Sequence, residues 1–267
     1  MHPATIDIGA NLTHDSFDDD REAVLDRAEA AGVSFFVLTG SSESGSRDAL
    51  ALARQYPQRM RSTAGVHPHH AAEYSDAVHA TLRELVADPL VVAVGECGLD
   101  YFRNFSPVEA QRMAFDRQLQ LAVETRQPVF LHQRDAHEDF VDILSGYIDD
   151  LPRAVAHCFT GDEEMLDRYL EMGLYIGITG WICDERRGAH LKEIVNRIPL
   201  DRLMIETDAP YLLPRTLRPK PKSRRNEPAY LPEVLRVVAE GYGESPASIA
   251  SATTATATRF FDLPAPD

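Results

Sequence analysis

Cysteine is scarce in this chain of 267 residues, and long apolar runs are missing. The three cysteines, Cys97, Cys158 and Cys183, lie far apart and form no Cys-x-x-Cys pair, which argues against a disulfide framework or a structural zinc site. No stretch of 18 or more apolar residues occurs, so we expect no membrane span. The N-terminus also lacks a basic region followed by an apolar one. We therefore expect no secretory signal and predict a cytoplasmic protein.

Positive charge is in short supply. The 27 lysines and arginines face 42 acidic residues, for a formal net charge of −15. This balance argues against unspecific binding of nucleic acid over the whole surface, although it leaves room for a local basic groove. No composition shift, internal repeat or heptad pattern interrupts the chain. We therefore predict a single domain over residues 1–267, a monomer, and no obligate protein partner.

Eight short runs rich in β-branched residues alternate with longer helical stretches. The predicted strands are 5–8, 33–39, 60–66, 91–94, 128–131, 153–156, 174–178 and 203–205. Predicted helices include 21–31, 108–124, 164–172, 231–241 and 247–261. Eight strand–helix units in a chain of this length predict an α/β fold of the TIM (β/α)8 barrel type. An open doubly wound sheet is the alternative, weakened because no Gly-x-Gly-x-x-Gly follows the first run.

Polar side chains follow six of the predicted strands directly. These segments are 7–11, 65–70, 95–101, 132–135, 157–161 and 206–210. The carboxyl ends of parallel strands meet on one face of a barrel, and barrel enzymes carry their active sites there. We therefore expect one active site built from these segments.

Imidazoles and carboxylates at four of these strand ends indicate a metal site. The predicted ligands are Glu96, His132, His157 and Asp208. Such a mixed set holds a divalent ion and leaves positions open for water. The alternative, a hydrogen-bonded polar network without an ion, would crowd these groups at a cost. Asp208 could also take the proton from an attacking water molecule, while Glu206 is either catalytic or a buried structural acid.

One loop is strongly basic. Residues 215–225 contain six basic residues and no acidic one, and they follow the strand that precedes Asp208. We expect contacts to phosphate, because arginine forks suit phosphate oxygens, with surface ion pairs as the alternative. In the segment 101–105, Phe102 and Phe105 either stack on unpaired bases or pack under a loop.

Six ordered motifs resemble the TatD family of metal-dependent deoxyribonucleases. They are Gly65-Val-His-Pro-His69, Gly95-Glu-Cys-Gly-Leu-Asp100, His132-x-Arg-Asp-Ala136, His157-Cys-Phe-Thr-Gly161, Glu206-Thr-Asp-Ala-Pro-Tyr-Leu212 and Arg224-Arg-Asn-Glu-Pro-Ala-Tyr-Leu-Pro232. The resemblance covers Asp7 to Phe261 and is closest to bacterial members of the family.

The resemblance implies a TIM barrel of the amidohydrolase type and a metal-dependent 3′–5′ exonuclease. Single-stranded DNA is the implied substrate, with RNA as a further one, Mg²⁺ the implied cofactor with Mn²⁺ as a substitute, and repair of oxidative DNA damage the implied setting. The four predicted ligands match the metal positions of the family, and His67 matches a position near the scissile phosphate. The expected catalytic residues are Asp208, Glu96 and His67, and the expected substrate-binding residues are His67, His69, Arg134, Arg218, Arg224 and Arg225.

The first motif departs from the wider family. Most members carry His-x-His after the first strand, whereas this chain has Gly9-Ala-Asn11. Gly9 offers no ligand and Asn11 only a neutral oxygen, so we expect one firmly held ion, a doubtful second site, and a preference for magnesium or manganese over zinc. Two rival functions stay open. A metal hydrolase acting on a small cyclic amide or lactone would not need the basic loop, and a non-catalytic binding module would hold no metal.

Overall fold

The computed structural model describes residues 3–264 of the chain. The strands are β1 (Thr5–Ala10), β2 (Val33–Leu38), β3 (Met60–Ala64), β4 (Val91–Asp100), β5 (Val129–Arg134), β6 (Ala154–Ala156), β7 (Tyr175–Ile178) and β8 (Leu203–Ile205). The α-helices are α1 (Arg21–Ala30), α2 (Glu43–Gln55), α3 (Asp76–Leu85), α4 (Val108–Thr125), α5 (His137–Ser145), α6 (Glu163–Glu171), α7 (Ala189–Ile194), α8 (Leu231–Tyr242) and α9 (Pro246–Phe261). None of the helices within these residues is long and apolar enough to cross a membrane.

The strands hydrogen-bond in the order in which they occur in the chain, from β1 to β8, in one sheet. The pairs β3–β4, β4–β5, β5–β6 and β7–β8 are parallel. The predicted strands and helices agree with these bounds to within two residues, with two exceptions. β4 runs six residues beyond its predicted end, and β5 runs three residues beyond its predicted end.

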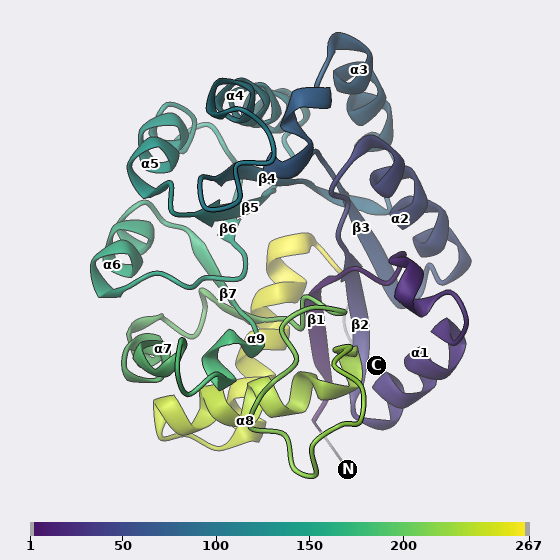
Figure 1. Ribbon diagram of the computed structural model, residues 1–267, viewed down its shortest axis with the longest axis vertical. Helices are drawn as coiled ribbons and strands as arrows, with labels where there is room; N and C mark the ends of the chain where they lie inside the picture. The colour runs from purple at the N-terminus through teal and green to yellow at the C-terminus, as the bar shows by residue number, and fades with distance from the viewer. Residues whose placement is uncertain (1–2, 265–267) are drawn as a thin grey trace. The chain divides into compact units, whose positions relative to one another are not determined.

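The chain divides into two compact units. Residues 38–157 and 171–174 form one of them, and it holds β3 to β6 together with α2 to α5. Within this unit α2 packs on β3 and α4 packs on β4, with the helices on the outer side of the strands (Figure 1). Phe115 of α4 and Phe140 of α5 stack with ring centroids 5.4 Å apart, and both are fully buried.

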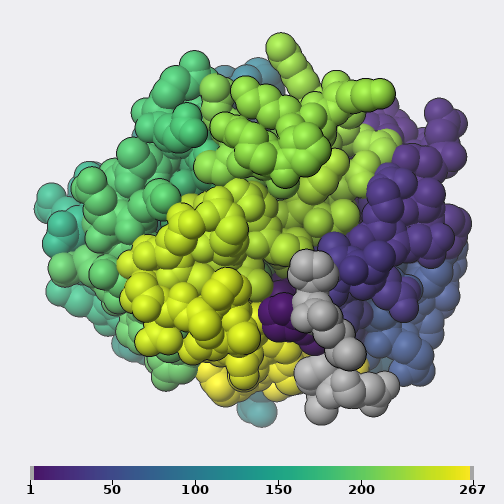
Figure 2. Space-filling view, turned by 90° about the horizontal axis from the view of Figure 1, so that it is seen from below, coloured from purple at the N-terminus to yellow at the C-terminus, as the bar shows by residue number. Residues whose placement is uncertain are grey.

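The second unit comprises residues 3–37, 158–170 and 175–264. It contains β1, β7 and β8, and α9 packs on both β1 and β8. Figure 2 shows the dark purple N-terminal residues against the yellow α9, and the Thr254 hydroxyl of α9 donates a hydrogen bond to the carbonyl of Ala4 there. Residues 206–227 form no helix or strand, so the predicted basic loop is indeed a loop, and its lime-green segment stands out from the surface in Figure 2.

The extension of β4 has a physical reason. The sequence Gly95-Glu-Cys-Gly98 resembles a turn, because two glycines interrupt the apolar run. In the structure Gly95 and Gly98 instead adopt φ values of 131° and 145° and allow β5 to approach closely. A Cβ on Gly98 would lie 1.9 Å from the carbonyl oxygen of His132. These glycines therefore continue the strand rather than end it.

Candidate metal centre

Glu96 lies in an irregularity of β4. The register of β4 against β5 shifts between Gly95 and Cys97, which leaves Glu96 as the extra residue. Such bulges re-aim a side chain and are frequent beside active sites. The Glu96 amide donates a 2.7 Å hydrogen bond to the carbonyl of Gly40, so its backbone is held in place. The carboxylate is buried, with a side chain that is 9% exposed.

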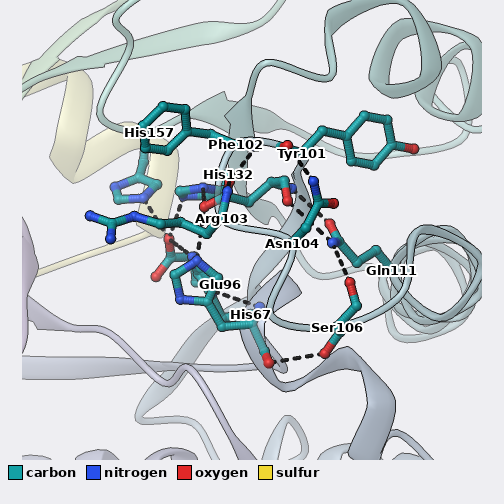
Figure 3. A network of polar contacts seen from close by, with 12 residues as sticks. His67, Glu96, Tyr101, Phe102, Arg103, Asn104, Ser106, Gln111, His132 and His157 are labelled. Carbon is teal, nitrogen blue, oxygen red and sulfur yellow. Dashed lines mark hydrogen bonds and ion pairs between the residues drawn. The ribbon is translucent and has the colours of Figure 1, made fainter.

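Three imidazoles converge on one oxygen of this carboxylate (Figure 3). The distance to Glu96 Oε1 is 2.8 Å from His157 Nε2, 3.0 Å from His132 Nδ1 and 3.4 Å from His67 Nε2. The three histidines come from different parts of the sheet: His157 directly follows β6, His132 lies within β5, and His67 lies three residues beyond the end of β3. Two of the predicted ligands, His132 and His157, therefore meet Glu96 as expected. His67, which was expected to contact the substrate, joins them at the same oxygen.

Electrostatics keep the carboxylate charged and one imidazole neutral. Burial by itself raises the pKa of Glu96, but His67, His157 and His132 outweigh it and bring this pKa well below its usual value. Burial lowers the pKa of His67 well below its usual value, against the attraction of Glu96. A carboxylate anion beside a neutral imidazole is the protonation state that binds a divalent cation.

His132 links Glu96 to a second acidic group. Burial lowers its pKa, but the nearby carboxylates of Asp100 and Glu96 outweigh this and leave the pKa raised. Its Nε2 atom is buried without a hydrogen-bond partner among the described residues, and Asp100 Oδ2 is 3.7 Å away. Asp100 Oδ2 also lies 2.8 Å from His69 Nε2. His69, expected to bind substrate, thus lies at the edge of the same cluster.

The donor set fits a metal ion. His67, Glu96 and His132 each offer one ligand atom, and these atoms lie within 4.8 Å of one another. The set combines nitrogen and carboxylate oxygen, and the buried Nε2 of His132 lacks a hydrogen bond among residues 3–264. These are the features of a site for a divalent cation, although they do not by themselves select one ion. The predicted metal-binding capacity therefore has a geometric basis.

Asp208, the fourth predicted ligand, belongs to the other unit. It follows β8 with a φ of 53°, a conformation that is strained for aspartate and is common at functional sites. Its amide donates to the carbonyl of Gly9 over 2.8 Å, and its Oδ1 accepts from the side-chain amide of Asn11 over 3.0 Å. The residues at which this chain departs from the wider family, Gly9 and Asn11, therefore both hold Asp208.

Two further acids of this unit, Asp7 and Glu206, are buried. Asp7 is fully buried and accepts hydrogen bonds from the amide and hydroxyl of Thr207 and from the amide of Gly9. Burial raises its pKa to about 7, and the neighbouring charge of Glu206 adds to this. Glu206 is fully buried, and its Oε1 accepts from the amide of Cys158 over 2.6 Å. Of the two interpretations of Glu206, this contact favours the structural one, since it holds the residue that follows His157.

The predicted phosphate-binding arginines differ in their surroundings. Arg218 and Arg224 are both exposed. Arg218 donates hydrogen bonds to the carbonyls of Arg215 and Leu217, and Arg224 forms no ion pair with any residue that the structure describes. Arg225 is half-buried, with ion pairs to Asp20 and Glu227 and its guanidinium 4.9 Å from the Phe17 ring. Hydrogen bonds from Arg225 thus anchor the end of the loop.

Comparisons with known proteins decide the family. The sequence model of TatD related DNases matches residues 6–262. The chain belongs to the TatD family. A protein of Erwinia tasmaniensis called 3′-5′ ssDNA/RNA exonuclease TatD is 54% identical over 257 residues, covering 96% of this chain and 99% of the relative. The protein of the same name from Salmonella typhimurium is 52% identical, with 96% and 98% covered.

Solved structures agree with this TatD assignment. The TatD homologue YjjV of Escherichia coli is 31% identical, with a TM-score of 0.89 and coverage of 97% of this chain and 98% of that one. An enamidase of the amidohydrolase superfamily, at 12% identity and a TM-score of 0.61, shares the fold alone. The predicted family and the predicted TIM (β/α)8 barrel are confirmed. The predicted hydrolase of ester bonds is confirmed at the level of the family, which is one of DNases.

Two features of the site do not follow from the sequence alone. Neither the place of His67 among the possible ligands nor the contact between His69 and Asp100 was expected. A signal for His67 exists in the sequence, since it directly follows the predicted strand 60–66 as His157 follows the predicted strand 153–156, but its position in Gly65-Val-His-Pro-His69 alone does not distinguish a ligand from a substrate-binding group.

Proposed function

We propose that the chain is a metal-dependent 3′–5′ exonuclease that acts on single-stranded DNA or RNA. The observation that carries the proposal is the convergence of His67, His132 and His157 on one oxygen of Glu96, in a member of a DNase family. Its relatives at 52–54% identity bear the name of such an exonuclease.

Each residue has a role that follows from its chemistry. Glu96, His132 and His157 would hold a divalent ion, with Asp208 as the fourth group expected from the sequence. When bound, such an ion supplies a Lewis acid that polarises the phosphate and makes water more acidic. His67 is a possible ligand too, but we assign it to the substrate: in the neutral form its Nδ1 accepts from the amide of His69, and its Nε2 can donate a hydrogen bond to a phosphate oxygen on which charge develops. Asp208, which the Asn11 amide orients, would accept the proton of the attacking water.

We infer that the ion is Mg²⁺, with Mn²⁺ as a substitute, and that one ion is firmly held. Asn11 supports this inference, because its side-chain amide donates to Asp208 where the wider family supplies imidazole ligands. A site with fewer nitrogen donors favours cations that prefer oxygen ligands. Isothermal titration of the metal-free chain with Mg²⁺, Mn²⁺ and Zn²⁺ should give one binding event per chain for manganese. Two tight manganese sites would contradict this.

The decisive test of the function is an assay of product sizes. The purified chain is incubated with 5′-labelled and 3′-labelled single strands of DNA and RNA in Mg²⁺, Mn²⁺, Zn²⁺ or a chelator. We expect 3′ label to be released at once as a mononucleotide, a 5′-labelled ladder that shortens progressively, and no cleavage with chelator. Release of the 5′ label first would reverse the polarity, and cleavage in chelator would remove the metal mechanism.

The basic loop separates the exonuclease from a hydrolase of small cyclic amides or lactones. Arg218, Lys220, Lys222 and Arg224 are exposed and can be neutralised together, while Arg225 is left intact because it pairs with Asp20 and Glu227. For an exonuclease, this variant should bind single strands more weakly, and binding should depend less steeply on salt concentration. Unchanged cleavage and an unchanged salt slope would speak for a small substrate.

The cellular setting also remains a proposal. If the chain acts in repair of oxidative DNA damage, cells that lack its gene should lose viability faster in hydrogen peroxide. The intact gene should restore survival, and a gene encoding the Glu96→Gln variant should not. Size-exclusion chromatography with light scattering tests the predicted monomer, and cell fractionation tests the predicted cytoplasmic location.

A further inference from the structure

One loop of the unit that contains Glu96 presents two aromatic rings to solvent. Phe102 is 55% exposed and Phe105 is 67% exposed, more than any other large apolar side chain among residues 3–264. Exposing two phenylalanines of one short loop is unfavourable for an isolated molecule, and contiguous apolar exposure of this kind usually marks a binding surface. Of the two interpretations of these residues from the sequence, packing under a loop is therefore wrong.

The loop from Tyr101 to Ser106 is firmly held. The Gln111 amide group of α4 donates to the carbonyls of Asp100 and Ser106 and accepts from the amide of Asp100 (Figure 3). The Asp100 carboxylate accepts from the amides of Phe102 and Arg103. Because these bonds fix both ends of the loop, the two rings keep their exposed positions without further ordering on binding.

The loop is continuous with the candidate metal centre. The Phe105 ring lies edge-on to His69, with centroids 4.7 Å apart, and His69 lies edge-on to His67 at 4.2 Å. The hydroxyl of Ser106 donates to the carbonyl of His69, which ties the loop to the segment that carries both histidines. In Figure 3, Phe102 and Arg103 extend in the direction of the cluster, whereas Tyr101 extends the opposite way.

Two cations accompany the rings. The Arg134 guanidinium lies 4.1 Å from the centroid of Phe102, and that of Arg103 lies 5.6 Å from it. Arg134 ends β5 two residues after His132, so it also connects the ring to the cluster. In a chain of net charge −15, this pairing of aromatic rings with arginines is suited to a ligand that is flat and apolar on one side and anionic on the other.

We propose that Phe105 and Phe102 are a stacking platform for unpaired nucleobases next to the metal centre. Phe105 takes the face of one base, and Phe102 with Arg134 takes the neighbouring base and its phosphate. The faces of bases inside a duplex are covered by their neighbours, so the platform selects single-stranded substrate. This inference rests on the proposed exonuclease function and assigns its strand specificity to particular side chains.

Kinetics on two kinds of strand test the platform. One substrate is an ordinary single-stranded oligonucleotide, and the other is a matched strand whose 3′-terminal nucleotides lack bases. Phe105→Ala should raise KM for the ordinary strand about tenfold, since stacking contributes about 1–3 kcal/mol per base, and leave the abasic strand unaffected. Phe102→Ala should have a smaller effect because Arg134 already covers the ring, and Phe105→Trp should restore the low KM.

The control is Leu200→Ala, which removes another exposed apolar side chain at the amino end of β8. It should change KM for neither strand. Equal losses on the ordinary and abasic strands, or no loss for Phe105→Ala on either, would overturn the platform.

A binding measurement separates failure of the platform from failure of the proposed function. A single strand carrying 2-aminopurine near its 3′ end is titrated with Glu96→Gln, which should not cleave it. Stacking on Phe105 should quench the fluorescence, and addition of Phe105→Ala to Glu96→Gln should abolish the quenching. Quenching that persists would overturn the platform even if the chain cleaves single strands. A chain that quenches through Phe105 but cleaves no strand with any ion retains the platform and loses the exonuclease.

Discussion

Glu96 and Asp7 are two buried carboxylates with opposite protonation behaviour. Around Glu96, three imidazoles outweigh the effect of burial and depress its pKa well below the usual range. Around Asp7 the neighbours are a hydroxyl, two backbone amides and a second acid, Glu206, and burial raises its pKa to about 7. Both acids belong to strands of the sheet, β4 and β1 respectively.

The comparison shows that burial alone does not assign a role to an acid. A carboxylate that stays ionised beside imidazoles able to act as ligands is prepared for a cation. Asp7 has no imidazole beside it to offset its burial, and its carboxyl group instead accepts hydrogen bonds from Thr207, the residue before Asp208. We therefore expect changes at Glu96 to act on rate and metal binding, and changes at Asp7 to act on stability.

The largest effect is expected for Glu96→Gln. It keeps the size of the side chain but removes the charge on which three imidazoles converge, so the rate of hydrolysis with Mg²⁺ should fall at least about 100-fold. Cleavage rates on a 3′-labelled strand measure the loss of activity, and titration with Mn²⁺ measures the loss of metal binding. The matched control, Asp7→Asn, should retain most of the rate. If the folded Glu96→Gln variant cleaved at the wild-type rate, the metal mechanism would be lost, and equal losses in both variants would end the distinction between the two acids.

The next largest effect is expected in the pH dependence of stability, through Asp7. Its pKa is about 7 in the folded chain and 3.8 ordinarily, so the protonated form favours folding. This contribution is complete below about pH 4 and is lost as the pH rises to about 7, and it amounts to at most about 4 kcal/mol. Asparagine imitates the protonated acid, so Asp7→Asn should flatten the pH dependence in this window. Urea denaturation of both proteins at several pH values measures this, and parallel profiles would contradict the raised pKa.

A smaller loss of stability is expected when a substitution at Gly98 disturbs the backbone near Glu96. Gly98→Ala places a Cβ against the carbonyl of His132 in a backbone conformation that alanine rarely adopts, and should lower the free energy of unfolding by about 3 kcal/mol. Gly173→Ala is the control, since Gly173 also has a positive φ but has no atom within 4 Å of the added Cβ. It should cost about 1 kcal/mol. Equal costs would show that close approach of β5 does not constrain the site.

The smallest effect is expected for Thr207→Val. The valine removes the hydroxyl that donates to Asp7 and accepts from the amide of Ala209, which should cost about 1–2 kcal/mol of stability. Loss of the donor should also raise the pKa of Asp7 further, because that hydrogen bond lowers it. The upper end of the pH window in the denaturation series should then move upward. A downward shift would mean that other neighbours set this pKa.

Much of the site could be predicted because strand ends are visible in sequence. His132 and His157 follow apolar runs, and parallel strands bring such ends together. Glu96 was found for the same reason, although its strand was predicted to end at residue 94. What could not be predicted is which atoms face each other. The bulge at Glu96 and the close approach at Gly98 depend on the backbone of β5, which lies more than 30 residues away in the chain.

The basic loop is a second case in which the sequence identifies the type of side chain but not its contacts. The sequence identified Arg218, Arg224 and Arg225 as similar, but the structure pairs Arg225 with Asp20 and Glu227 and leaves Arg224 exposed. Charge can be counted along the chain, whereas its availability depends on partners that folding brings together.

The order of amino acids alone determined the alternation of strands and helices, the family, and the kinds of group able to bind a cation, since these follow from local periodicity and motif spacing. Only the folded chain decided that His67 shares an oxygen of Glu96 with His132 and His157, that burial raises the pKa of Asp7, and that two phenylalanines face solvent. Each of those outcomes depends on burial and on neighbouring groups from distant segments of the chain. Neither exists until the chain has folded.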